Sequence, residues 1–140
     1  MSLTRKRALE FLRQCALGTV ATVGEDGTPE AALVNLAVTD DLEVIFETIQ
    51  TTQKCINLRR NPRAAVVASL GEETLQYQGI ADEPDAFALK PLLEVYFAAQ
   101  PAALRHRGWP GLTWFRVKPR WIRLSRYGDT WDVSELRIAR

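Results

Sequence analysis

Two short apolar segments joined by a turn constrain the fold of this chain most. Residues 17–23 (LGTVATV) are small and β-branched, and residues 29–38 (PEAALVNLAV) follow directly after the turn Glu25-Asp26-Gly27-Thr28. β-Branched residues favour extended backbone, and an Asp-Gly pair between two such segments is typical of a β-hairpin. The sequence therefore predicts a β-hairpin over residues 17–38.

Further strands are expected along the rest of the chain. Gly79 lies inside one of them and indicates a bulge or a close backbone approach. Because strands that follow one another usually pair, the sheet should be antiparallel and closed into a barrel. The expected strands cover residues 42–47, 63–70, 74–82, 112–117 and 120–127, with the last two joined at Lys118-Pro119.

Three helices are expected around this sheet. The first covers residues 4–15 with Thr4 as its N-cap, and the second begins at Thr51 or Thr52 and ends before Pro62. The third covers residues 84–99, where Pro91 should kink or divide the helix. The prediction is one mainly β (α+β) domain over residues 1–140, with peripheral helices.

Composition excludes several classes of function. The 18 basic and 17 acidic side chains give a net charge of +1, so bulk charge favours neither a nucleic-acid nor a membrane partner. Cys15 and Cys55 are the only cysteines, too few for a disulfide framework or a zinc site, and both are interpreted as buried apolar residues. With no apolar run of membrane-spanning length and no signal peptide pattern, a cytoplasmic protein is expected.

Familiar catalytic patterns are also absent from the sequence. There is no Walker-type loop and no GxGxxG motif, and no nucleophile can be matched to a histidine by spacing. His106 is the only histidine and lies in the polar segment RHRGWPG. It is interpreted as a solvated loop residue, with a role in substrate binding or catalysis as the alternative.

One lysine occupies an unfavourable position. Lys54 falls in the first turn of the second expected helix, where a cation is disfavoured by about 0.3–1 kcal/mol. The hydroxyls of Thr48 and Thr52 and the free N–H groups of the helix start lie nearby in sequence, and together these groups form a generic anion site. An anion would remove the conflict at Lys54. The alternative is an exposed lysine that tolerates its position.

The same segment resembles a known family. Residues 48–62 fit the T-x-x-x-S-x-K-x-x-x-L-x-x-N-P stretch of pyridoxamine 5′-phosphate oxidase-like proteins, which are flavin-binding split barrels. The resemblance also covers the hairpin GTVATVGEDGTP and the segments 78–82 and 115–124. It implies an antiparallel split β-barrel of about six to seven strands, an FMN cofactor, and a homodimer with the flavin at the subunit interface.

The resemblance also implies which residues contact FMN. Gln53 and Lys54 would bind its phosphate, and residues 32–37 would lie along its isoalloxazine ring. No metal site is implied, and no catalytic residue can be assigned. The implied cofactor-binding residues are Val34, Asn35, Glu47, Thr48, Thr52, Gln53, Lys54 and Thr74.

Two departures from the family pattern bear on the substrate. Ala32 stands where pyridoxamine-phosphate oxidases have a flavin-binding arginine, and Ala37 stands where they have a substrate-binding lysine. A methyl group cannot replace a charged contact, which argues against pyridoxamine phosphate as the substrate. The expected function is an FMN-dependent oxidoreductase with an unassigned small-molecule substrate.

Several alternatives stay open. The protein could be a non-enzymatic flavin-binding or flavin-sensing module, or the same barrel could bind a deazaflavin or haem, with His106 as the only histidine available to ligate haem. The four tryptophans are interpreted as core or dimer contacts. Stacking of Trp109 or Trp114 on the flavin or over a substrate pocket is the alternative.

Overall fold

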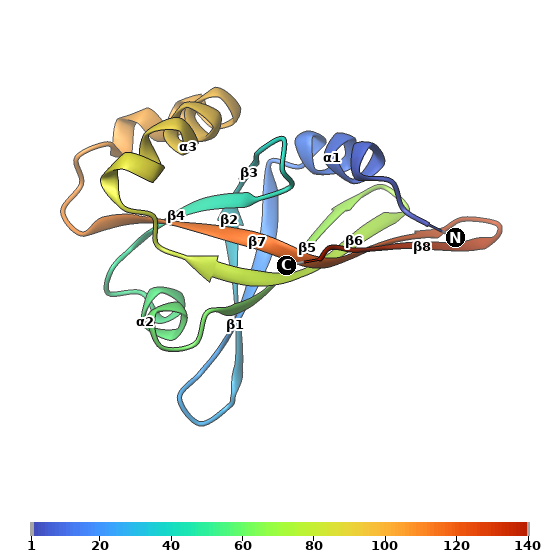
Figure 1. The fold of residues 1–140 in the computed structure, drawn as a ribbon, viewed down its shortest axis with the longest axis horizontal. Coiled ribbons are helices and arrows are strands. Elements are labelled where there is room, and N and C mark those ends of the chain that lie inside the picture. The colour runs from blue at the N-terminus through green and yellow to red at the C-terminus, as the bar shows by residue number, and fades with distance from the viewer. Residues whose placement is uncertain (1, 140) are drawn as a thin grey trace.

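The computed structural model describes residues 2–139. Its sheet and helices are shown in Figure 1. The helices are α1 (Arg5–Gln14), α2 (Gln53–Arg60) and α3 (Ala86–Ala99), followed by the 3-10 helix η1 (Pro101–His106). The strands are β1 (Leu17–Val23), β2 (Pro29–Asn35), β3 (Ala37–Val38), β4 (Val44–Ile49), β5 (Arg63–Leu70), β6 (Glu73–Asp82), β7 (Leu112–Tyr127) and β8 (Trp131–Arg137).

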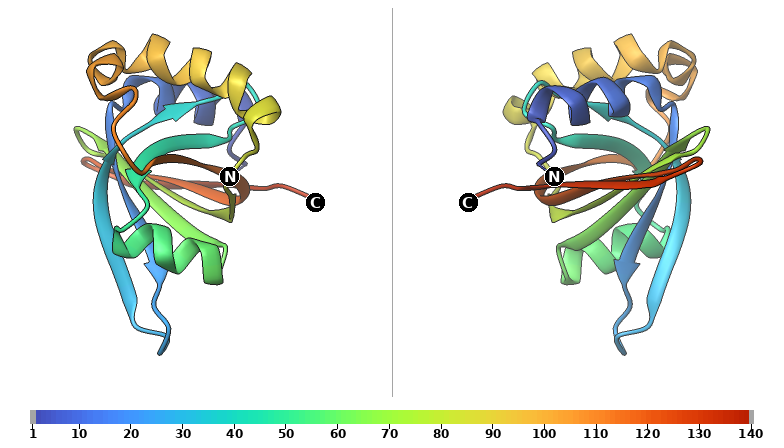
Figure 2. Two further views of the ribbon diagram at one scale, coloured as in Figure 1. Left: turned by 90° about the vertical axis from the view of Figure 1, so that its left-hand side faces the viewer. Right: turned by 90° about the vertical axis from the view of Figure 1, so that its right-hand side faces the viewer.

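These strands form one eight-stranded antiparallel sheet. Its order is β2-β1-β5-β6-β7-β4-β3, and β8 pairs with β7 outside this path. The sheet curls into a half-barrel, with β2 at one edge and β4 with β3 at the other. The two edges approach each other without pairing. Helices α1 and α3 lie together at one end of the curled sheet and α2 at the other (Figures 1 and 2).

Two apolar clusters stabilise this arrangement. The larger one fills the inside of the curl, and α1 closes it with Phe11 and Leu12. The smaller one lies between α3 and strands β4 and β7, around Tyr96 and Trp114. Strand β4 contributes to both clusters because successive side chains of a strand point to opposite faces: Phe46 belongs to the first cluster, while Ile45 belongs to the second.

The predicted hairpin, the N-cap of the first helix and the start of the second helix are confirmed. Strands β1 and β2 pair from Leu17 opposite Asn35 to Val23 opposite Pro29. The second strand ends at Asn35, earlier than predicted, because residues 37–38 pair with β4 instead. Thr4 and Thr52 are the N-caps of α1 and α2. The split-barrel fold class is therefore confirmed, whereas full closure of the barrel was wrong.

Three details of the prediction were wrong. Residues 112–127 form one strand, because a register shift opposite Gly79 lets β7 continue past Pro119. Strand β8 was not predicted at all. Pro91 lies inside an uninterrupted α3, so it does not divide this helix. The carbonyl that loses a helical partner there is that of Phe87, whose 92% exposure allows water to satisfy it.

Gly79 occupies a position where its lack of a side chain matters. A Cβ atom at this residue would lie 2.3 Å from the backbone oxygen of Lys118. The predicted close backbone approach at Gly79 is thus confirmed, and it lies next to a register shift in which Arg120 of β7 is the extra residue. Among residues 2–139, no helix combines the length and apolar character needed to cross a membrane.

Candidate functional site

A cavity of about 270 Å³ opens where the two edges of the curled sheet face each other. Four parts of the chain form its walls: the end of β2, the end of β4, the start of α2, and the segment from α3 through η1 to the start of β7. The lining residues are Leu33, Val34, Asn35, Glu47, Thr48, Ile49, Thr52, Lys54, Tyr96, His106, Trp109 and Leu112.

Two threonine hydroxyls define the wall next to α2. Oγ1 of Thr52 accepts the backbone N–H of Cys55 at 3.4 Å and donates to the carbonyl of Ile49 at 2.9 Å. Its 2.7 Å contact with Oγ1 of Thr48 must therefore use the proton of Thr48. Both hydroxyls are thus fixed at the start of α2, whose first N–H groups have no partner inside the helix.

Lys54 lies in the first turn of α2 and is half-buried. Burial lowers the pKa of its ammonium group. None of the ion pairs within residues 2–139 involves Lys54. The conflict with the helix dipole is therefore not relieved by a carboxylate of this part of the chain, so the wall remains electropositive.

The opposite wall is built around Glu47. Its Oε1 lies 3.4 Å from Nδ1 of His106, and the ring of His106 packs 4.3 Å from that of Trp109 between centroids. Nε of Arg105 donates to Nε2 of His106 at 3.3 Å. Because a guanidinium N–H can only donate, Nε2 accepts and Nδ1 carries the proton that is directed toward Glu47.

Tyr96 lies beside this pair and is fully buried. Burial raises the pKa of its phenol, and the nearby charge of Glu47 adds to the effect. The hydroxyl is therefore a neutral donor at physiological pH. Within residues 2–139, neither Oη of Tyr96 nor Oε2 of Glu47 has a hydrogen-bond partner.

The structure brings six of the eight predicted residues to this cavity and leaves two elsewhere. Gln53 donates its side-chain amide to Oδ1 of Asn57 at 2.9 Å. Thr74 pairs with Ser125 near the far end of β7, about 40 Å of strand from Thr113. The six residues in the cavity are Val34, Asn35, Glu47, Thr48, Thr52 and Lys54.

The sequence did not assign Tyr96 to the site, and it named His106 and Trp109 only as alternatives. All three reach the cavity because α3 and η1 fold back over β4, which no spacing in the sequence shows. The one signal in the sequence was a tryptophan and a histidine within the polar segment RHRGWPG, and the structure leaves Trp109 half-exposed there.

The two alanines that depart from the family pattern lie in different surroundings. Ala37 is buried in the smaller apolar cluster with Ile45 and Tyr96. Ala32 is half-buried in β2, opposite Val20 of β1. A lysine at position 37 would bring a charge into this packed cluster, so the alanine fits its surroundings.

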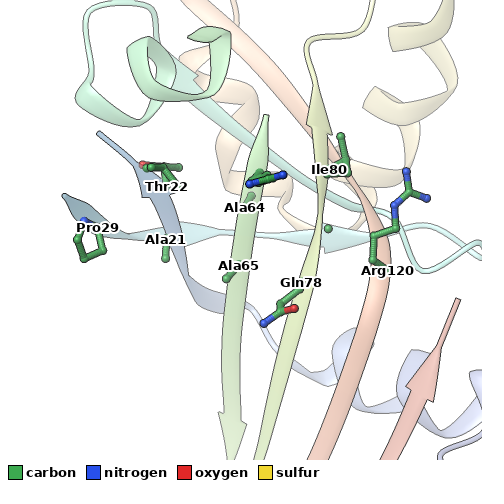
Figure 3. A pocket seen from close by; sticks show the side chains of 11 residues that line it. Ala21, Thr22, Pro29, Ala64, Ala65, Gln78, Ile80 and Arg120 are labelled. Atoms are coloured by element: carbon green, nitrogen blue, oxygen red, sulfur yellow. The ribbon is translucent and has the colours of Figure 1, made fainter. Parts of the chain in front are cut away.

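A second hollow of about 380 Å³ lies over neighbouring parts of β1, β5 and β6 (Figure 3). Small side chains such as Ala21 and Ala65 form its floor, with Gln78 and Arg120 beside them.

No group of three or more His, Cys, Asp or Glu side chains that could bind a metal occurs within residues 2–139.

Comparison with known proteins agrees with this architecture. A pyridoxine/pyridoxamine 5′-phosphate oxidase of Thermosynechococcus vestitus is 34% identical over 94 residues, which is 65% of this chain and 42% of the relative. The chain thus spans less than half the length of that relative.

Solved structures with the same fold include a haem-binding protein of Mycobacterium smegmatis, with a TM-score of 0.79 and 17% identity over 96% of this chain and 59% of that one. General stress protein 26 of Bacillus anthracis gives a TM-score of 0.71 and 18% identity over 95% and 98% of the two chains. At these identities the likeness establishes the fold alone. The family profile of pyridoxamine 5′-phosphate oxidase matches residues 4–126. The chain therefore belongs to the pyridoxamine 5′-phosphate oxidase family.

Proposed function

We propose that this protein binds FMN in the cavity between β2 and β4 and acts as a flavin-dependent oxidoreductase on a small molecule other than pyridoxamine phosphate. One observation carries the proposal. Lys54, without an ion-pair partner among the described residues, lies in the same cavity as the fixed hydroxyls of Thr48 and Thr52. A phosphate would neutralise Lys54 and accept from the free N–H groups at the start of α2, which the two hydroxyls hold in place.

The remaining walls suit the rest of the cofactor. Val34 and Asn35 would lie along the flavin ring, as the family resemblance implies. Gln53 could reach the phosphate only by releasing Asn57, so we propose that Lys54 contributes more to phosphate binding. When bound, FMN supplies two-electron redox chemistry, while the chain binds it, orients it and limits access of water.

We further propose a cytoplasmic homodimer. Thr74 is remote from this cavity in its own chain, so a flavin contact from Thr74 would have to reach the cofactor of a second copy. The apolar hollow around Ala21 and Ala65 offers that copy a surface (Figure 3). The molar mass in solution, measured by light scattering with and without FMN, tests this arrangement. A monomer in both conditions would contradict it.

Titration with FMN and with riboflavin, followed by flavin fluorescence, tests the phosphate site. We expect Lys54→Met to weaken FMN about tenfold or more and to leave riboflavin nearly unchanged, because only FMN carries the phosphate. Lys90→Met, at an exposed site of α3, is the matched control. Failure of FMN to bind the wild-type protein would contradict FMN binding. Equal loss of both ligands would contradict the phosphate assignment.

Reduction of the bound flavin by a reduced nicotinamide cofactor, with turnover of an acceptor, would support the enzyme. Bound flavin without turnover would support a flavin-binding module. Haem is the second candidate, because Nδ1 of His106 is directed at a carboxylate, as in many metal-ligating histidines, although Nε2 would first have to release Nε of Arg105. A haem absorption band that His106→Ala abolishes would support it. Stronger binding of a deazaflavin than of FMN would favour that cofactor.

A further inference from the structure

Two buried polar atoms, in residues that line the cavity, have no hydrogen-bond partner within residues 2–139. One is Oε2 of Glu47, an acceptor, and the other is Oη of Tyr96, a donor. Leaving such groups unpaired is unfavourable, because each has lost its hydrogen bonds to water. Both belong to residues that line the same cavity, so one ligand edge with a donor beside an acceptor could satisfy them together.

Successive side chains of β4 point to opposite faces of the sheet, and this separates Glu47 and Tyr96 from the proposed phosphate site. Glu47 points to the same face as Ile45, toward α3, whereas Thr48 points to the face of Phe46. A ligand that crosses the end of β4 would therefore meet Lys54 and the threonines with one end. Its other end would meet Glu47 and Tyr96.

His106 fixes which oxygen of Glu47 is available. Its Nδ1–H is directed at Oε1, because Nε2 is occupied by the donor Nε of Arg105. Oε2 is thereby left as the free acceptor. His106 is a positioning residue in this arrangement. Its contact with Oε1 of Glu47, at 3.4 Å, is long for a hydrogen bond, so the carboxylate can still accept a stronger hydrogen bond from a ligand.

Taking FMN binding as proposed above, we infer that Glu47 and Tyr96 recognise the pyrimidine edge of the flavin ring. That edge carries one ring N–H, at N3, between two carbonyl groups. Oε2 of Glu47 accepts the N3 proton, and the hydroxyl of Tyr96 donates to the neighbouring carbonyl. The selected ligand class is a phosphorylated planar ring with an N–H next to a carbonyl.

Binding of FMN and of FMN methylated at N3, each measured by fluorescence titration, tests this inference without relying on activity. We expect the methylated compound to bind the wild-type protein about tenfold or more weakly, since it cannot donate to the carboxylate. Glu47→Ala should reduce this ratio toward one, and His106→Asn should reduce it partly. Glu94→Ala on α3 is the matched control and should keep the wild-type ratio.

The outcomes separate this inference from the proposed function. Tight FMN binding with equal affinity for the methylated compound would overturn the inference and leave FMN binding intact. A wild-type preference that Glu47→Ala fails to change would also overturn it, because the methyl group would then be excluded by shape alone. Failure of both compounds to bind would overturn both. The wild-type comparison decides even where Glu47→Ala does not fold.

Discussion

Nδ1 of His106 lies 3.4 Å from Oε1 of Glu47 and so joins η1 to the end of β4, two parts of the chain 59 residues apart. The backbone N–H of Gln50 reinforces the connection by donating to the carbonyl of Gly111 at 2.8 Å. Between these two contacts, residues 106–111 form one wall of the cavity. The mobility of this wall should therefore depend on the His106 side chain.

His106→Ala should loosen residues 106–111 without unfolding the protein. The substitution removes a long hydrogen bond to Glu47, worth about 0.5–1.5 kcal/mol or less, together with the packing of the ring against Trp109. Hydrogen exchange followed by mass spectrometry should show faster exchange in this segment and unchanged exchange in β1. Arg107→Ala, which removes the contact of this guanidinium with the ring of Phe97, is a control in the same segment. Equal acceleration in both variants would contradict a specific role for His106.

Lys54→Met should stabilise the protein without ligand at neutral pH. Burial lowers the pKa of Lys54, so the unfolded chain binds its proton more tightly than the folded one. The destabilisation is fully present below the folded pKa and fades as pH rises toward 10.5, the ordinary value. The dipole conflict alone suggests about 0.3–1 kcal/mol at pH 7.

Urea unfolding at pH 7 and pH 10.5 measures this effect. The stability advantage of Lys54→Met over the wild type should shrink at the higher pH. Lys90→Met, at an exposed position of α3, should show no comparable narrowing. A stability advantage of Lys54→Met that grew with pH would contradict a lowered pKa of Lys54 in the folded protein. The same variant should still bind FMN more weakly than the wild type.

Local chemistry allowed much of the fold and part of the site to be predicted. The Asp-Gly turn and the β-branched residues around it fix the hairpin of β1 and β2. Lys54 in a first helical turn is an anomaly visible in sequence, and it indicated the anion wall of the cavity. The family resemblance added Glu47, which lies there.

What could not be predicted depends on contacts between distant segments. Pro119 should end a strand, but a register shift, with Arg120 as the extra residue opposite Gln78 and Gly79, lets β6 pair with β7 on both sides of Pro119. Tyr96 reaches the cavity only because α3 packs on β4 and β7 through Leu92 and Trp114. Neither relationship follows from spacing along the chain.

Asn57→Ala should be strongly destabilising. Asn57 is fully buried, and its side-chain amide donates to Oγ1 of Thr22 at 3.0 Å and to Oε1 of Glu30 at 3.3 Å. Its removal leaves the buried hydroxyl of Thr22 without this partner and should cost about 2 kcal/mol or more in urea unfolding. Gln53→Ala removes only the exposed end of the same network and should cost less than about 1 kcal/mol. Similar costs for both variants would contradict the network.

Gly79→Ala should weaken the pairing of β6 with β7. The loss of stability should be larger than the difference in backbone preference between glycine and alanine would give. The added Cβ would lie 2.3 Å from the backbone oxygen of Lys118 and 2.8 Å from Cγ1 of Val117, and a backbone oxygen in a paired strand cannot move aside. We expect a loss of about 2–4 kcal/mol in the free energy of unfolding.

Gly128→Ala is the matched control for this substitution. Its Cβ would come closest to the carboxylate of Glu72, a largely exposed side chain that can rotate away, and would be in ordinary contact with Arg126. The free energy of unfolding should therefore change by about 0.5 kcal/mol or less. An equally small loss of stability for Gly79→Ala in urea unfolding would contradict this prediction. The close approach of Gly79 to Lys118 would then not be needed for β7 to continue past Pro119.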